Sequence, residues 1–160
     1  MELRQFVQHD LARLIDLTIE TFGPFYEDHF RPVVGETVFR HQHGDWREDY
    51  RSQVPGFHDP ENDKYVVVAE RNGVIVGYIG WAVELERGRG EIAIVAVDAE
   101  HRGQGVGTAL CDHAIADITG RGARMVAVGT GGDDFHAPAR ALYERLGFTY
   151  YPVAVYFKEL

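Results

Sequence analysis

The chain has 160 residues, of which 45% are hydrophobic and 26% charged, a composition that fits one folded domain over residues 1–160 and excludes a disordered chain. No apolar run reaches the roughly 18 residues of a membrane helix. The net charge of −9 argues against a nucleic-acid partner, because an acidic surface repels phosphate. Cys111 is the only cysteine and the N-terminus lacks the pattern of a signal peptide, so we expect a cytoplasmic location and no membrane partner.

The N-terminal third begins with a strand and a helix. Alternating polar and apolar residues predict a short strand over residues 2–7. Asp10 precedes apolar residues at helical spacing, and Gly23-Pro24 predicts the end of this helix. Residues 24–63 mix aromatic, histidine and charged side chains with glycines and prolines. We expect an irregular segment there with one or two helices, one of them near residues 44–53.

The middle and the end of the chain alternate strands and helices. Asn72-Gly73 predicts a tight hairpin turn between strands at 64–71 and 74–85. The nearly continuous apolar run at 91–97 predicts a central strand covered on both faces. Further elements are expected at residues 105–119 (helix), 125–128 (strand), 136–146 (helix), and 148–151 and 153–157 (two closing strands). This order predicts an α/β (α+β) domain with a mixed sheet, and the closing strands could support a homodimer.

A glycine-rich turn follows the predicted central strand. It reads Arg102-Gly103-Gln104-Gly105-Val106-Gly107-Thr108 and opens a helix. A diphosphate needs backbone N–H groups that it can approach closely and the positive end of a helix dipole. Glycines remove the Cβ atoms that block this approach, and Arg102 adds a positive charge. An ordinary strand-to-helix turn is the alternative. A dinucleotide-binding turn and a P-loop both fit poorly, because the glycine spacing and the lysine that they require are missing.

Two blocks together resemble a known family. Arg102-x-x-Gly105-x-Gly107, and the later run from Ala141 to Phe148 (Ala-Leu-Tyr-Glu-Arg-Leu-Gly-Phe), are similar to motifs of the GNAT superfamily of N-acyltransferases. The resemblance covers about residues 64–158. It implies a twisted, mostly antiparallel sheet with a V-shaped splay between central strands and helices on both faces. It also implies acetyl-CoA as co-substrate and an N-acetyltransferase activity on a primary amine.

The resemblance assigns the cofactor contacts. Main-chain groups of Val95, Ala96 and Val97 would pair with the pantetheine arm. The diphosphate would be held by Arg102 and by the amides of the glycine-rich turn, namely Gly103, Gln104, Gly105, Val106, Gly107 and Thr108. His136 stands where many relatives carry an asparagine that contacts the cofactor, so it could bind the cofactor or act as a base.

The same resemblance suggests the catalytic groups. Tyr143 matches the family's tyrosine, which would contact the cofactor and protonate the leaving thiolate as general acid. Glu91 is a candidate for the general base, with His136 and a water chain as open alternatives. The Val95 N–H is the expected oxyanion donor. A non-catalytic acyl-CoA-binding sensor or interaction module remains a second interpretation of the same motifs.

Residues 20–63 are expected to shape the acceptor site. They combine eight Phe, Tyr and Trp side chains with ten carboxylates against four arginines. Carboxylates beside aromatic faces can hold a cation, so we predict a small, positively charged amine as acceptor. His41 and His43 lack the partners of a four-ligand site, so no metal is expected.

Overall fold

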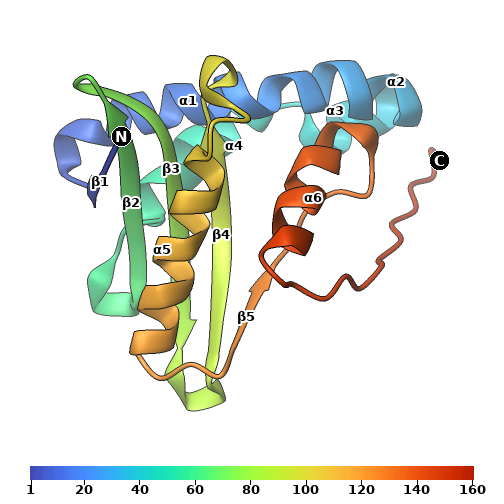
Figure 1. Ribbon diagram of the computed structural model, residues 1–160. Helices are drawn as coiled ribbons and strands as arrows, with labels where there is room; N and C mark the ends of the chain where they lie inside the picture. The colour runs from blue at the N-terminus through green and yellow to red at the C-terminus, as the bar shows by residue number, and fades with distance from the viewer.

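The computed structural model describes residues 1–160 and is built on a five-stranded sheet in the order β1-β2-β3-β4-β5 (Figure 1). The first four strands pair antiparallel, and β5 runs parallel to β4. The strands are β1 (Glu2–Gln5), β2 (Lys64–Arg71), β3 (Val74–Glu84), β4 (Arg89–Val97) and β5 (Met125–Val128). The mixed, mostly antiparallel sheet is therefore confirmed.

Helices cover both faces of this sheet, with α5 on one face and α1 on the other (Figure 1). Alternate residues of β2 serve the two cores: Val67 and Ala69 pack toward α5, and Val66 and Val68 toward α1. None of the helices is both long and apolar enough to cross a membrane. The helices are α1 (Leu11–Pro24), α2 (Arg31–Val34), α3 (Glu36–His43), α4 (Trp46–Gln53), α5 (Val106–Gly120) and α6 (Ala137–Arg145).

The predicted hairpin between β2 and β3 is confirmed. Asn72 has φ 53° and Gly73 has φ 78°, and a type I′ turn requires positive φ at both central residues. Asparagine and glycine tolerate this conformation better than other residues do, which is why the pair could be recognised in the sequence.

A β-bulge in β4 determines where the sheet opens. Gly80 of β3 pairs with Ile94 and the next residue, Trp81, pairs with Ile92, so Ala93 is the extra residue. Ile92 consequently packs in the α5 core and Ile94 in the α1 core. β5 pairs only with Arg89–Ile92, before the bulge, and then diverges from β4 (Figure 1). The V-shaped splay that the family resemblance implied lies at this point.

The predicted end of the first helix at Gly23-Pro24 agrees with the end of α1, but the chain does not leave the helical conformation there. The helical run continues through Pro24, whose φ of −58° suits a helix, into a π-helical turn at Phe25–Phe30. Gly23 serves packing instead, because a Cβ there would lie 3.1 Å from Trp46. The segment that we expected to be irregular therefore carries α2, α3 and α4, and α4 matches the helix predicted near residues 44–53.

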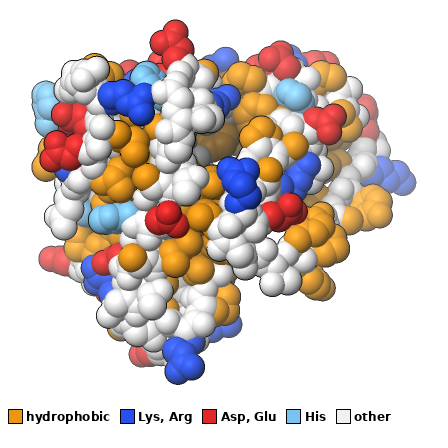
Figure 2. Space-filling model, viewed as in Figure 1, with side chains coloured by type: hydrophobic (Ala, Val, Ile, Leu, Met, Phe, Trp, Pro, Cys, Tyr) orange, Lys and Arg blue, Asp and Glu red, His pale blue; other side chains and the backbone are white.

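The two closing strands predicted at 148–151 and 153–157 are absent. After α6 the chain forms no further helix or strand and runs unpaired to Leu160. Its end instead contacts the helical segment, by which we mean residues 25–53. The Phe157 ring packs 5.5 Å from that of Phe30, and Thr37 Oγ1 donates to Glu159 Oε1 at 3.1 Å. Several apolar side chains of this C-terminal segment are exposed, and Figure 2 shows hydrophobic side chains on the side of the molecule where it runs.

Candidate active site

The glycine-rich turn between β4 and α5 presents a row of free amides. Gly103 and Gly105 have φ 70° and 81°, which favour glycine, and α5 begins at Val106. The N–H groups of residues 103–108 donate no hydrogen bond within the chain, and the first to do so is Ala109 N–H, to Gly105 O at 3.0 Å. Consecutive free amides at a helix N-terminus form a binding site for an anion.

Hydrogen bonds of the Gln104 side chain fix the conformation of this turn. Gln104 Nε2 donates to Glu100 O at 2.8 Å, and Arg71 Nη1 donates to Gln104 Oε1 at 2.5 Å. A Cβ on Gly105 would meet nothing within 4 Å, so no other part of the chain covers this glycine. Gly107 has a different role, because a Cβ there would lie 3.2 Å from Leu142 of α6. The turn is thus preformed, and α6 packs closely behind its first helical turn.

Beyond the bulge, one edge of β4 is free for pairing. Asp98 N–H donates to Val76 O at 2.9 Å, which makes Asp98 and Val76 a hydrogen-bonded pair. Pairs alternate in an antiparallel ladder, so the main-chain groups of Val97 and Val95 point away from β3. Arg102 Nε donates to Val97 O at 3.2 Å, which agrees with this direction. An extended ligand could therefore hydrogen-bond to Val95.

A cleft of about 320 Å³ lies in the splay. Residues 92–95 of β4 form one wall, and His136, Ala139 and Tyr143 form another along the start and one face of α6. The third wall is aromatic and comes from the helical segment and the chain around it: Phe22, Phe25, Tyr26, Tyr50 and Phe57. The free edge of β4 and the Tyr143 side chain thus meet in one cavity.

Tyr143 lies between this cleft and a second cavity of about 670 Å³ beside β5 and the C-terminal segment. Its ring packs edge-on against Phe148, with 5.8 Å between the centroids. Burial, with a smaller effect of Cys111, raises the pKa of Tyr143 to about 12. The phenol therefore keeps its proton at neutral pH, as a general acid must. Cys111 is fully buried in the α5 core and has a packing role.

Glu91 lies outside the cleft. Its side chain is 57% exposed, and Arg89 Nη2 donates to its Oε2 at 3.0 Å. The residue precedes the bulge, whereas the cleft begins at Ile92. The structure thus separates Glu91 from Tyr143, the other residue that the sequence suggested for catalysis.

His136 does line the cleft, and it has a partner that the sequence analysis missed. Its Nδ1 lies 2.6 Å from Asp133 Oδ1, and its side chain is only 15% exposed. Burial opposes ionisation of Asp133, but the hydrogen bond to His136 and nearby backbone N–H groups outweigh it and hold the pKa of that carboxyl below its usual value. The signal in the sequence is the spacing Asp-x-x-His at the start of a helix, where Asp133 also caps Phe135 N–H at 3.2 Å.

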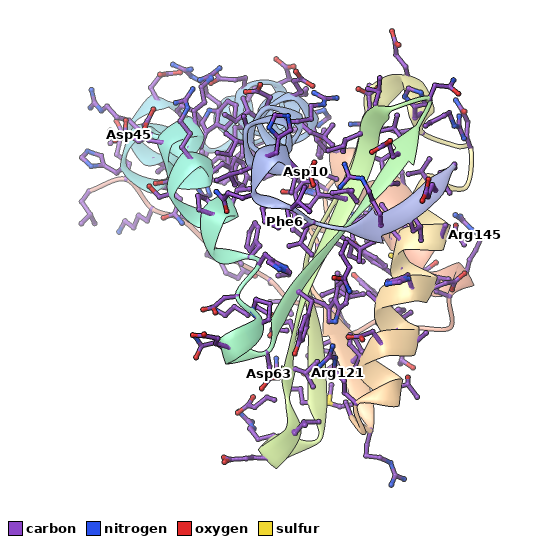
Figure 3. All side chains as sticks on the ribbon, turned by 90° about the vertical axis from the view of Figure 1, so that its left-hand side faces the viewer. Phe6, Asp10, Asp45, Asp63, Arg121 and Arg145 are labelled. Carbon is purple, nitrogen blue, oxygen red and sulfur yellow. The ribbon has the colours of Figure 1, made fainter.

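The carboxylates of residues 20–63 lie away from the cleft, although the aromatic residues of that stretch line it. Arg31 Nη1 donates to Glu27 at 2.7 Å, and Arg31 also binds Glu36. Figure 3 shows Asp45 at the outer edge of the helical segment. No carboxylate is among the residues that line the cleft, and no set of His, Cys, Asp or Glu side chains is grouped so as to hold a metal ion.

Residues 14–148 match the profile of the acetyltransferase (GNAT) family. The chain belongs to this family. GNAT proteins use acetyl-CoA, and the free amides and the open β4 edge described above are suited to its diphosphate and its pantetheine arm.

Known relatives support this membership, and a solved structure shares the fold. The chain is 30% identical to the mycothiol acetyltransferase of Streptomyces griseus over 97% of its own length and 51% of that protein. It is 32% identical to N-alpha-acetyltransferase 30 of Schizosaccharomyces pombe, over 67% of this chain and 72% of the relative. The PaiA N-acetyltransferase of Thermoplasma acidophilum, solved with coenzyme A, superposes with a TM-score of 0.70 at 16% identity, over 92% of this chain and 89% of that one. This GNAT chain spans about half the length of the mycothiol acetyltransferases that it matches.

Proposed function

We propose that this protein transfers the acetyl group of acetyl-CoA to a primary amine by direct attack within a ternary complex. The observation that carries the proposal is the row of unbonded amides at residues 103–108, which lies at the end of the strand whose free edge leads into the cleft. The names of two relatives, a mycothiol acetyltransferase and an N-alpha-acetyltransferase, agree with acetyl transfer.

Each part of acetyl-CoA has a counterpart in the chain. The diphosphate accepts hydrogen bonds from the amides of residues 103–108, and the positive end of the α5 dipole stabilises its charge. Arg102 adds a cation beside it. The pantetheine arm extends β4 as an additional strand along the main chain of Val95, Ala96 and Val97. The thioester then lies in the splay, against Tyr143.

The chemistry requires a proton donor and an oxyanion donor. The nitrogen lone pair of the acceptor attacks the acetyl carbonyl carbon, and the negative charge that develops on the carbonyl oxygen is stabilised by the Val95 N–H. The C–S bond then breaks. The Tyr143 hydroxyl gives its proton to the leaving sulfur and regains one from the nitrogen through solvent, so that CoA leaves as the neutral thiol.

The acceptor is proposed to be a small, positively charged amine. Because no carboxylate lines the cleft, the cation would be held by ring faces of residues such as Phe25, Tyr26 and Tyr50. The carboxylates on the outer surface would act only at longer range, through the negative potential of a chain with net charge −9.

A panel of amines tests this function. The protein is incubated with acetyl-CoA and with spermidine, glucosamine or alanine amide, and products are identified by mass. Acetylation of at least one amine is expected, with a new amide bond and one equivalent of free CoA. If CoA at 100 times its dissociation constant raises stability by about 2.7 kcal/mol but no amine reacts, the protein is a binding module and the proposal fails. A clear preference for neutral or anionic acceptors would refute the cationic substrate alone.

A further inference from the structure

We propose that His136, oriented by Asp133, is the general base that takes the proton of the acceptor's ammonium group. This inference rests on the proposed function and specifies one step of it. Its basis is the position of the imidazole in the wall of the cleft and the bond that fixes it there.

No other group in the cleft wall can perform this step at neutral pH. The wall contains no Asp, Glu, Lys, Arg or Cys, and its remaining titratable side chains are Tyr26, Tyr50 and Tyr143. Burial raises the pKa of all three phenols, so they hold their protons and cannot accept another. An imidazole is the side chain that gains and loses a proton between pH 5 and 8.

The contacts of His136 leave the required nitrogen free. Because Asp133 is ionised, the bond of 2.6 Å has Nδ1–H as donor and fixes the tautomer in which Nε2 carries the lone pair. The ring packs edge-on against Phe25 and Phe135, with centroids 4.8 and 4.9 Å away, and these two rings also contact each other at 5.8 Å, so His136 is one member of a compact aromatic cluster. Nε2 makes no hydrogen bond within the chain.

The loop before α6 supports the Asp133–His136 pair from behind. Arg140 Nη1 donates to Gly131 O at 2.6 Å and to Asp133 O at 2.7 Å. Gly131 is so close that a Cβ there would collide with both Asp133 Oδ1 and His136 Nδ1. A Cβ on the neighbouring Gly132 would meet nothing within 4 Å. Of these two glycines, only Gly131, which faces the Asp133–His136 pair, must therefore lack a side chain.

The proton balance is complete with these groups. The ammonium nitrogen loses two protons when it becomes an amide nitrogen. His136 Nε2 takes the first before attack and releases it to solvent. The second leaves the nitrogen after attack and replaces the proton that Tyr143 gave to the sulfur. Asp133 stays ionised throughout and stabilises the imidazolium, so it is a positioning residue.

His136→Asn is the first test, measured with acetyl-CoA and the fastest amine of the panel. Asparagine retains polar contacts but cannot take up a proton, so kcat/KM for the amine should fall at least about 100-fold, with CoA binding unchanged by calorimetry. The acidic limb of the wild-type pH profile should move to the higher pH range in which the acceptor's own ammonium group loses its proton, so that activity recovers where the amine is already neutral. If His136 is only a cofactor ligand, an asparagine there, which contacts the cofactor in many relatives, should keep both the activity and the shape of the profile, and the inference is overturned.

Matched neighbours test the positioning of the ring. Gly131→Ala should lower kcat about tenfold or more without changing CoA affinity, whereas Gly132→Ala should match the wild type. Asp133→Asn should shift the acidic inflection of the profile, and Asp134→Asn, with the same charge change on an exposed neighbour, should not. Equal effects of the two members of either pair would contradict the inference.

Glu91→Gln tests whether Glu91, and not His136, is the general base. If that change, and not His136→Asn, moves the acidic limb to higher pH, Glu91 is the base and the inference is wrong. A wild-type protein that acetylates no amine would instead refute the proposed function, so the two failures can be told apart.

Discussion

Replacement of Gly105 by alanine separates the folding role of the glycine-rich turn from its binding role. Gly105 has φ 81°, so an alanine there must adopt a left-handed conformation that costs about 1–2 kcal/mol. Its Cβ would meet no atom of the chain within 4 Å. The side chain would therefore cause no clash in the free protein, but it would occupy the space through which phosphate oxygens approach the amides.

Two magnitudes follow from this geometry. Each kcal/mol of lost stability lowers Tm by roughly 2–4 °C for a protein of about this size, so Gly105→Ala should melt roughly 2–8 °C lower. A hydrogen bond to a charged group contributes about 1.5–3 kcal/mol. Loss of one amide–phosphate contact should therefore weaken CoA binding about 10- to 100-fold, at 1.4 kcal/mol per tenfold change in Kd.

Gly122→Ala provides the control. Gly122 follows the other end of α5, has φ 99°, and a Cβ there would also meet nothing within 4 Å. Both variants should lose similar stability in thermal melts, but calorimetric titration with CoA should show weaker binding only for Gly105→Ala. Normal CoA affinity in Gly105→Ala, or equal weakening in both variants, would refute the assignment of the diphosphate to this turn.

Three further predictions concern the active site and the core. Tyr143→Phe should reduce kcat at least about 100-fold in a CoA-release assay while calorimetry shows unchanged CoA affinity, because only the proton donor is lost. Asp10→Asn should cost about 3 kcal/mol in urea denaturation at pH 7, because it removes the ion pair of 2.8 Å between the buried carboxylate and Arg4. The hydrogen bond from Arg4 holds the pKa of Asp10 below its usual value, so this difference should be complete above about pH 4 and shrink as the pH falls further. Gly90→Ala should lose about 1–3 kcal/mol, because its Cβ would collide with Ile118, and the double variant with Ile118→Ala should lose less than the two single losses combined.

The sequence could predict elements whose cause is local. The hairpin at Asn72-Gly73 and the turn at Gly105 depend on conformations that few residues adopt, so residue identity alone indicates them. The packing role of Gly23 was missed because its cause is tertiary. The same residue type can allow a turn or the close approach of a distant side chain, and only the fold brings Trp46 against it.

The same distinction between local and tertiary causes applies to the candidate active site. Most of the proposed cofactor contacts lie in one continuous stretch from Val95 to Thr108, and the motif in it suggested them. The pairing of Asp133 with His136 spans only three residues, but many Asp-x-x-His sequences make no such bond. This pair differs in its surroundings: the Gly131 backbone lies close to both side chains, and aromatic rings pack against His136. No local sequence pattern encodes these contacts. The unpaired C-terminal segment was missed because strand propensity does not reveal whether a partner edge is reached.

The bulge at Ala93 connects the fold to the chemistry. If the same residues alternated regularly with no bulge, Ile94 would face α5 and Val95 would face α1, so the two cores would exchange side chains beyond this point. The bulge lets β4 pack correctly on both sides while it bends away from β5, whose pairing ends at Ile92. The strand therefore has a free edge only beyond Ile92, where we propose that the thioester lies. The position of the proposed catalytic site is thus set by a register shift in the sheet. The helices that carry Tyr143 and the aromatic wall complete a cleft that the strands have already opened.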